Sequence, residues 1–278
     1  MLHFRALTLL LVCLIFPSVS SADQVEPAAT TIRIGGSGST LGTMKILGEA
    51  FKKTHLHATV VIVPSLGSGG GIQAMLAGAI DIAVISRSLK DAERSQGVIG
   101  IEYARTPFVF ATATQANVSA ISTHELVSIY KGERKTWPDG RPLRLVLRPE
   151  SDSDTDIAKS LSPEMNQAVK IALTREGMIL TPTDKANADS LETIPGTFGT
   201  TTLAQIISEK RALQPLALNG VTPSLKTLAD GKYPYYKTFI MVSNPKTNPL
   251  AQQFIGFVRS AAGQQILEKN GHWVAPAK

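Results

Sequence analysis

The chain has 278 residues, of which 43% are hydrophobic and 18% are charged, and its formal net charge is +6. This length allows a substantial buried core without disulfide bonds, and the single cysteine excludes a disulfide framework. The basic residues are scattered and aromatic residues make up only 6% of the chain, so no nucleic-acid-binding stripe is predicted.

The N-terminus has the features of a secretory signal peptide. A short positive segment (1–5) precedes an apolar segment (6–16) that is too short to span a membrane, and small residues follow it up to Ala22. We expect cleavage after Ala22 rather than a lipid anchor at Cys13, because Val12 stands where a lipoprotein signal has a small residue. The mature chain would then have 256 residues (278 − 22), no cysteine and a net charge of +5 (27 basic minus 22 acidic residues).

Two strand–loop–helix units follow one another at the start of the mature chain. In the first, residues 31–34 lead into Gly35–Thr40 and a helical segment at 40–53. In the second, residues 60–63 lead into Gly67–Gly71 and a helical segment at 70–79. Each Gly/Ser loop presents backbone N–H groups and hydroxyls at a helix N-terminus, where the partial charge is positive. The pair of loops therefore predicts a binding site for a small anion.

Strands and helices alternate along the rest of the chain, which is typical of an α/β fold with a mostly parallel sheet. The expected strands are 31–34, 60–63, 80–85, 108–113, 143–147, 178–181, 216–218 and 238–242. The expected helices are 40–53, 70–79, 123–130, 163–175, 185–193, 201–210, 249–260 and 263–270. Ser122 and Asp184 are the expected N-caps of two of them. The expected helix contributions to the core are Leu47, Phe51, Ile206, Ile207, Phe254 and Val258.

Two extended segments, 102–107 and 233–237, are interpreted as paired hinge strands, although Pro–Tyr clusters are also found in ordinary surface turns. This interpretation divides the chain into a signal peptide at 1–22, a discontinuous lobe 1 at 23–105 and 236–278, and a lobe 2 at 106–235. A two-lobed protein places its ligand in the cleft between the lobes and closes around it.

Motifs of enzymes and metal sites are not satisfied. Lys45 is followed by Ile46 and the glycine spacing is wrong, so the phosphate-binding loop of nucleotide hydrolases is excluded. No serine has the flanking glycines of a hydrolase nucleophile elbow. His55 and His57 lack a suitably spaced carboxylate or cysteine and are interpreted as loop residues. No catalytic residue, metal or cofactor is predicted.

Several short motifs occur in an order that resembles the periplasmic phosphate-binding proteins of ABC importers. They are Gly38-Ser39-Thr40, Gly67-Ser68-Gly69-Gly70-Gly71, the run from Asp81 to Arg87, Ile129-Tyr130-Lys131-Gly132 with Trp137, Arg148 with Ser153-Asp154-Thr155, and Tyr233-Pro234. Together they span nearly the whole mature chain. The resemblance implies a two-lobed type II solute-binding fold with two hinge strands, working as a monomer in the periplasm. It also implies capture of inorganic phosphate or a related oxyanion, delivery to an ABC permease in the inner membrane, and no enzymatic activity.

The resemblance also assigns roles to residues of this chain. The first helix would bind the anion through Gly38, Ser39, Thr40 and Leu41, with the Thr40 side chain and the backbone around Ser39 and Leu41 as donors. The second would contribute Ser68 and the Gly69 N–H group. Arg148 would supply positive charge from the other lobe, and Ser153, Asp154 and Thr155 would form a turn at a third helix N-terminus. Ser86 and Arg87 stand where related proteins contact the ligand, although Arg87 also fits a solvated surface position.

The turn that follows Arg148 departs from the family pattern. Asp154 replaces a glycine of the family, the spacing from Arg148 is one residue longer, and Asp152 and Asp156 add two more carboxylates. These aspartates would repel an anion unless they cap the helix or point to solvent. Helix capping and a change of ligand remain open alternatives. The second functional hypothesis is accordingly a sensor or accessory protein that keeps the fold but has altered or lost phosphate binding.

Overall fold

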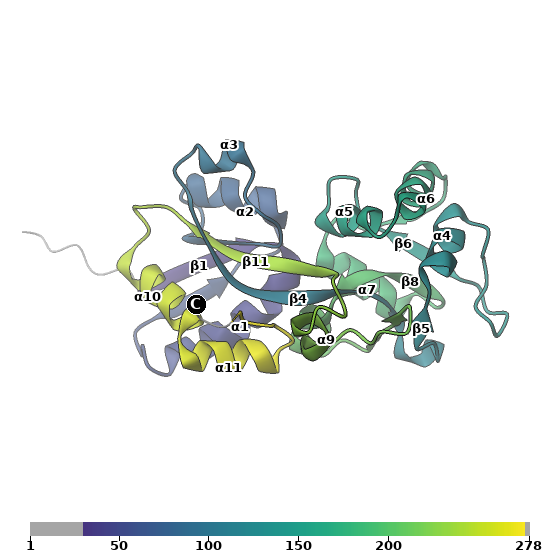
Figure 1. The fold of residues 1–278 in the computed structure, drawn as a ribbon. Coiled ribbons are helices and arrows are strands. Elements are labelled where there is room, and N and C mark those ends of the chain that lie inside the picture. The colour runs from purple at the N-terminus through teal and green to yellow at the C-terminus, as the bar shows by residue number, and fades with distance from the viewer. Residues whose placement is uncertain (1–29, 276–278) are drawn as a thin grey trace, which may run out of the picture.

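The computed structural model describes residues 30–275, so the expected signal peptide lies outside the described residues. Figure 1 shows two lobes joined by two long strands, β4 (Ile99–Ala113) and β11 (Tyr236–Ser243). These strands pair in antiparallel register, with Lys237 opposite Thr106. The two segments expected to be hinge strands are thus neighbours, as predicted.

Lobe 1 contains the two N-terminal strand–loop–helix units and the C-terminal helices. Its elements are β1 (Thr31–Gly36), α1 (Gly38–Lys52), β2 (Thr59–Ile62), α2 (Gly67–Leu76), β3 (Ile82–Ile85), α3 (Asp91–Arg94), α10 (Pro249–Arg259) and α11 (Ala261–Lys269). The strand order is β2-β1-β3-β11-β4, in which β1, β2 and β3 are parallel. The buried core includes Leu47 and Phe51 of α1 and Phe254 and Val258 of α10, as the helical periodicity predicts.

Lobe 2 is built on the second half of β4. Its elements are η1 (Thr114–Ala116), β5 (Ala120–Ile121), α4 (Thr123–Lys131), β6 (Arg144–Leu147), α5 (Ser153–Ser160), α6 (Pro163–Thr174), β7 (Ile179–Leu180), α7 (Asp184–Thr193), β8 (Thr197–Thr202), α8 (Leu203–Ser208), β9 (Leu213–Pro215), β10 (Ala217–Leu218) and α9 (Leu225–Ala229). The strand order is β4-β8-β6-β7, with β9 also paired to β4. Its core gathers Phe110, Trp137 and Phe198.

The α/β class is confirmed, but the sheet is mixed, because β11 and β4 run antiparallel to their neighbours. Two expected elements have different bounds in the structure. The strand expected at 108–113 begins at Ile99. The helix expected at 201–210 spans only Leu203–Ser208, because residues 201 and 202 belong to β8, a strand that was not expected because its Thr-rich sequence lacks an alternating apolar pattern. Ile207 was expected in the core but is 40% exposed. Its neighbour Ile206 is buried, and consecutive residues of a helix point in different directions.

Two glycines permit close approaches at the end of β1, by β3 and by α2. Gly36 has a φ of +139°, and a Cβ there would lie 2.0 Å from the Val84 carbonyl oxygen. A Cβ at Gly71 would lie 2.7 Å from the Gly36 Cα. Only glycine permits these approaches. They place the N-terminus of α2 beside the loop that leads into α1.

The loops that follow β1, β3, β6 and β7 lie at the carboxyl ends of parallel strands, the usual position of ligand sites in α/β sheets. They carry Ser37, Ser86, Arg148 and the segment 182–184. None of the helices between residues 30 and 275 is long and apolar enough to cross a membrane.

Candidate functional site

A cavity of about 300 Å³ lies between the two lobes. Lobe 1 contributes Ser37, the start of α2 and the segment from Ser86 to Lys90, and lobe 2 contributes Arg148, the start of α5 and the start of α7. The N-termini of α2, α5 and α7 therefore border the cavity directly, and Ser37 brings the N-terminus of α1 to its edge. Helix N-termini carry partial positive charge and unpaired N–H donors, so this arrangement favours a negatively charged ligand.

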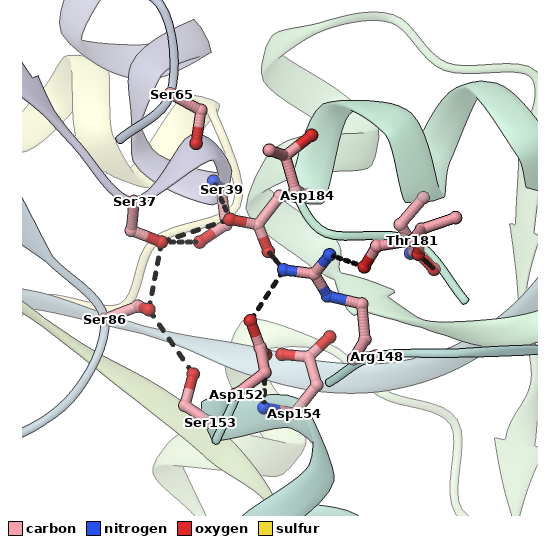
Figure 2. Close-up of polar contacts among 12 residues, drawn as sticks. Ser37, Ser39, Ser65, Ser86, Arg148, Asp152, Ser153, Asp154, Thr181 and Asp184 are labelled. Atoms are coloured by element: carbon pink, nitrogen blue, oxygen red, sulfur yellow. Dashed lines mark hydrogen bonds and ion pairs between the residues drawn. The ribbon is translucent and has the colours of Figure 1, made fainter. Parts of the chain in front are cut away.

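The lobe 1 wall is a network of serine hydroxyls (Figure 2). The Ser37 Oγ lies 3.0 Å from the Ser39 Oγ and 3.0 Å from the Ser86 Oγ. The Ser86 N–H donates to the Ser68 Oγ over 3.2 Å. The serine network itself carries no formal charge, although Arg87 and Lys90 of lobe 1 also line the cavity. Each hydroxyl of the network can turn to donate or accept.

Arg148 is the buried cation of the lobe 2 wall and follows directly after β6. Its guanidinium donates to the Thr181 carbonyl oxygen over 2.6 Å and pairs with Asp152 over 2.6 Å. The residue is only 4% exposed, and its Nε has no hydrogen-bond partner among the described residues. A buried donor without a partner costs about 1–3 kcal/mol. The guanidinium is therefore held rigidly at the cavity and is not fully satisfied by the protein.

Asp184 carries a carboxylate across the boundary between the lobes. It is the first residue of α7, and its Oδ2 accepts hydrogen bonds from the Ser39 N–H over 3.0 Å and from the Ser37 hydroxyl over 3.2 Å. Its Oδ1 lies 3.5 Å from Arg148. The expectation that Asp184 is the N-cap was wrong, because Thr183 caps α7 by accepting from the Ala186 N–H. Asp184 is thereby free to cap α1 of the other lobe.

A second buried ion pair lies behind the cavity. The Lys237 Nζ of β11 contacts the Asp154 carboxylate and lies 3.8 Å from Asp184, and Thr200 donates to Asp154 over 2.9 Å. Lys237 is 2% exposed and Asp154 is 1% exposed. Asp154 therefore neither caps α5 nor lines the cavity, and Lys237 provides the opposite charge that its burial requires.

The remaining two aspartates of this turn have separate environments. Asp152 is the N-cap of α5, accepting from the Asp154 N–H over 2.9 Å, and it also pairs with Arg148. Asp156 is exposed. Asp152 is thus a helix cap, Asp154 is buried beside a cation, and Asp156 faces solvent. Of the three, only Asp152 borders the cavity.

The pKa values of the buried acids diverge. Burial opposes ionisation of Asp184, but Lys237, Arg148 and the Ser39 N–H outweigh it and hold its pKa below the usual value. Burial raises the pKa of Asp154, and the nearby carboxylates of Asp152 and Asp184 add to the rise. Burial by itself lowers the pKa of Lys237, yet Asp154 and Asp184 reverse this and raise it. Asp184 and Lys237 are consequently charged at neutral pH.

The structure brings half of the expected ligand residues to the cavity. The residues that line it are Ser68, Gly69, Ser86, Arg87, Arg148 and Ser153. Ser153 reaches across the cleft, with its Oγ 3.5 Å from that of Ser86. Arg87 is held in a bidentate pair with Glu93, at 2.8 and 2.7 Å, so its charge is already matched.

The other expected residues lie around the cavity. Gly38 and Leu41 line a different groove beside α1, and the Thr40 hydroxyl donates to the Ser37 carbonyl oxygen of its own helix over 2.7 Å. Ser39 lies in the serine network, with its N–H bound to Asp184. Asp154 and Thr155 lie behind Arg148, where the Thr155 hydroxyl donates to the Pro149 carbonyl oxygen over 2.8 Å. The side chain of Thr40 is fully buried, so in this structure it offers no donor to the cavity.

Sequence reasoning missed Ser37, Asp184 and Lys237 as members of the site. Ser37 lies within the Gly35–Thr40 loop, whose hydroxyls were predicted to bind an anion, so the same reasoning could have included it. Asp184 follows an expected strand at 178–181, whose carboxyl end lies beside that of the strand bearing Arg148. Nothing in the sequence indicated that Lys237 is buried, because a lysine in a strand is ordinarily exposed. Within residues 30–275, no group of three or more His, Cys, Asp and Glu side chains is arranged to hold a metal ion.

Comparison with known proteins identifies the family. The profile of the PBP superfamily domain matches residues 21–262. The phosphate-binding protein PstS of Borreliella burgdorferi is 25% identical over 247 residues, which cover 86% of this chain and 88% of that protein. Protein SphX of Synechococcus elongatus is 27% identical over 299 aligned positions, covering 99% of this chain and 86% of that protein.

Solved structures confirm the fold. A substrate-binding protein from Clostridium perfringens with bound phosphate superposes with a TM-score of 0.73 at 20% identity, covering 88% of this chain and 99% of that one. An ABC-type phosphate transport receptor from Vibrio cholerae gives a TM-score of 0.60 at 20% identity, covering 88% and 100%. The chain therefore belongs to the PBP superfamily of solute-binding proteins, which are not enzymes; it has their type II fold, and its distant homologues include proteins named phosphate-binding protein PstS.

Proposed function

We propose that this protein captures phosphate or a related small oxyanion in the cavity between its lobes and delivers it to an ABC importer in the inner membrane. The protein works in the periplasm as a monomer, after removal of residues 1–22. Its lobes are 23–105 with 236–278, and 106–235. The distant homologues named phosphate-binding proteins support this function.

One observation carries the proposal. The N-termini of four helices, two from each lobe, meet at one cavity with a buried arginine whose Nε lacks a partner among the described residues. The start of α2 has no side-chain cap, so its first N–H groups are available to a ligand. A micromolar ligand requires about −8 kcal/mol. A few charge-assisted hydrogen bonds of roughly 1.5–3 kcal/mol each supply that amount.

Calorimetric titration against phosphate, sulfate, molybdate and tungstate tests the proposal. At a ligand concentration of about one hundred times Kd, binding stabilises the fold by about 2.7 kcal/mol. In a protein of this size this raises Tm by roughly 5–10 °C. The absence of both heat and thermal shift with all four anions at millimolar concentration would rule out transport of inorganic oxyanions.

The charge distribution favours a second candidate function, a sensor or accessory protein with altered or lost phosphate binding. Three carboxylates, Asp152, Asp154 and Asp184, surround two buried cations, Arg148 and Lys237. This excess of negative charge opposes an anionic ligand. A protein that remains folded, binds none of the four oxyanions and still associates with a membrane partner would support this second function.

A further inference from the structure

The carboxylate of Asp184 occupies the place where an anion would bind at α1. Its Oδ2 accepts hydrogen bonds from the Ser39 N–H at 3.0 Å and from the Ser37 hydroxyl at 3.2 Å, and both donors belong to lobe 1 (Figure 2). Asp184 itself belongs to lobe 2 and is 7% exposed. A carboxylate and a tetrahedral oxyanion recognise the same groups, a helix N-terminus and serine hydroxyls.

Helix α1 has no cap of its own. Its N-cap residue Ser37 makes no side-chain capping bond, and its first turn contains no acidic residue. In lobe 2, by contrast, the N-caps Ser122, Asp152, Ser162 and Thr183 each accept a hydrogen bond from their own helix. Asp184 thus supplies the negative charge that the dipole of α1 lacks. An oxyanion that binds at α1 must replace it.

The buried cluster of carboxylates and cations has one carboxylate in excess, and the exposed Lys90 at the cavity edge brings the charges around the cavity into balance. The cations are Arg87, Lys90, Arg148 and Lys237, and the carboxylates are Glu93, Asp152, Asp154 and Asp184. An added anion would make the site net negative, and while Asp184 stays at α1 the anion would also place a second negative charge at that helix N-terminus. Two like charges at one helix N-terminus repel each other strongly in a buried site.

Asp184 keeps charged partners when it leaves α1. Its Oδ1 lies 3.5 Å from Arg148 and 3.8 Å from Lys237, and neither cation belongs to α1. A small rotation of the side chain toward these cations frees the Ser39 N–H and the Ser37 hydroxyl. Displacement of Asp184 from α1 therefore leaves no buried charge without a partner, so the high free-energy cost of an unpaired buried charge is avoided.

We propose that Asp184 is an internal competitor for the oxyanion, which sets the affinity of the site: its carboxylate holds the lobes together through Ser39 and Ser37, and the ligand binds by displacing it. This inference rests on the proposed function for the identity of the ligand. The alternative role, an acceptor for a ligand hydroxyl, predicts the opposite effect of neutralising Asp184.

The test compares Asp184→Asn with the wild type by calorimetric titration with inorganic phosphate at fixed pH and low salt. Asparagine keeps the shape and an acceptor oxygen but removes the charge, so we expect Kd to fall roughly tenfold or more. Asp189→Asn is the matched control on the same helix; it removes the same charge from a side chain that pairs with Lys185 and Arg211, and it should leave Kd within about twofold. Weaker or unchanged binding by Asp184→Asn would overturn the inference while leaving the proposed function intact.

A second comparison separates competition from general electrostatics. Asp152→Asn also removes a carboxylate that borders the cavity, but the Asp152 carboxylate bonds to Arg148 and the Asp154 N–H and, within residues 30–275, makes no hydrogen bond to α1. We expect a smaller gain in affinity from Asp152→Asn than from Asp184→Asn, and equal gains would contradict a competitor at α1. Circular dichroism and Asp184→Ser, which keeps an oxygen without the charge, control for a folding defect.

Small-angle scattering without added anion tests the same contact independently of ligand binding. Loss of the carboxylate in Asp184→Ser should raise the radius of gyration, because the lobes lose their contact through Ser39 and Ser37. If neither the wild type nor the variant binds phosphate, the proposed function fails and competition with phosphate fails with it; the expansion then decides only whether Asp184 holds the lobes together. An unchanged radius of gyration would overturn that role.

Discussion

The two walls of the cavity are built by different physical means. The lobe 1 wall relies mainly on neutral donors, namely serine hydroxyls and the N-termini of α1 and α2, neither of which is capped by its own side chains. The charge of its Arg87 is already matched by Glu93, and its Lys90 is exposed. The lobe 2 wall uses formal charges, Arg148 with Asp152 and Asp184, and its helices are capped. Neutral donors define the shape of the binding site and allow the ligand to exchange. Buried charges add affinity only when their attraction for the ligand exceeds the cost of burying them. Affinity and ligand choice are therefore expected to respond more strongly to changes in lobe 2.

The largest expected effect is on stability and comes from Lys237→Met. Removing the cation leaves Asp154 buried without its partner, and breaking a buried pair in this way costs about 3–5 kcal/mol. Urea unfolding of wild type and variant measures the loss. The double variant Lys237→Met with Asp154→Asn should recover part of it, because the uncompensated charge is gone. A double variant as unstable as the single one would show that Lys237 acts through packing alone.

Arg148→Gln should produce the largest loss of affinity. Each charge-assisted hydrogen bond to the ligand contributes roughly 1.5–3 kcal/mol, so phosphate binding should weaken about tenfold to more than a hundredfold. The exposed Arg141, paired with Asp139 on the lobe 2 surface, provides the control as Arg141→Gln. Calorimetric titration gives both values. Equal Kd values for the two variants would remove Arg148 from the site.

A buried histidine of lobe 1 predicts a pH effect on stability. His272 is fully buried beside Thr43, at 2.8 Å, and burial lowers its pKa to about 3. Between the unfolded pKa of about 6.5 and this value, the unfolded chain binds a proton that the folded chain does not, so stability falls as pH falls. The slope should approach about 1.4 kcal/mol per pH unit below pH 6.

Urea unfolding at several pH values measures this slope in the wild type and in His272→Gln. Glutamine retains a hydrogen-bonding group for Thr43 but does not titrate, so the difference between the two proteins should narrow as the pH falls. Parallel pH profiles would assign the acid sensitivity to other groups, such as the carboxylates of lobe 2.

The smallest expected effect is that of the neutral wall. Ser68→Ala removes one hydroxyl from the cavity, and a neutral hydrogen bond contributes about 0.5–1.5 kcal/mol. Phosphate binding should weaken roughly two- to tenfold. Ser65→Ala, in the loop that precedes α2, is the comparison variant. A loss as large as that of Arg148→Gln would reverse the contrast between the two walls.

Local patterns in the sequence determined the fold class and much of the neutral wall. The Gly/Ser loops before α1 and α2 are contiguous segments, and the anion-binding property of a helix N-terminus depends only on its own residues. The same locality predicted the N-cap Ser122 and the buried faces of α1 and α10. Strand β8 was missed because its threonines are buried through tertiary hydrogen bonds, not through an apolar alternation.

Only the tertiary structure decided which charges meet. Asp184 lies far along the chain from Ser37 and Ser39, and Lys237 lies far along it from Asp154, yet each pair is in contact. Electrostatic interaction depends on distance in space and on burial, neither of which is encoded by sequence spacing. The sequence by itself thus determined that a helix N-terminus would receive an anion, and the packing of the two lobes decided that a carboxylate of the protein already lies there.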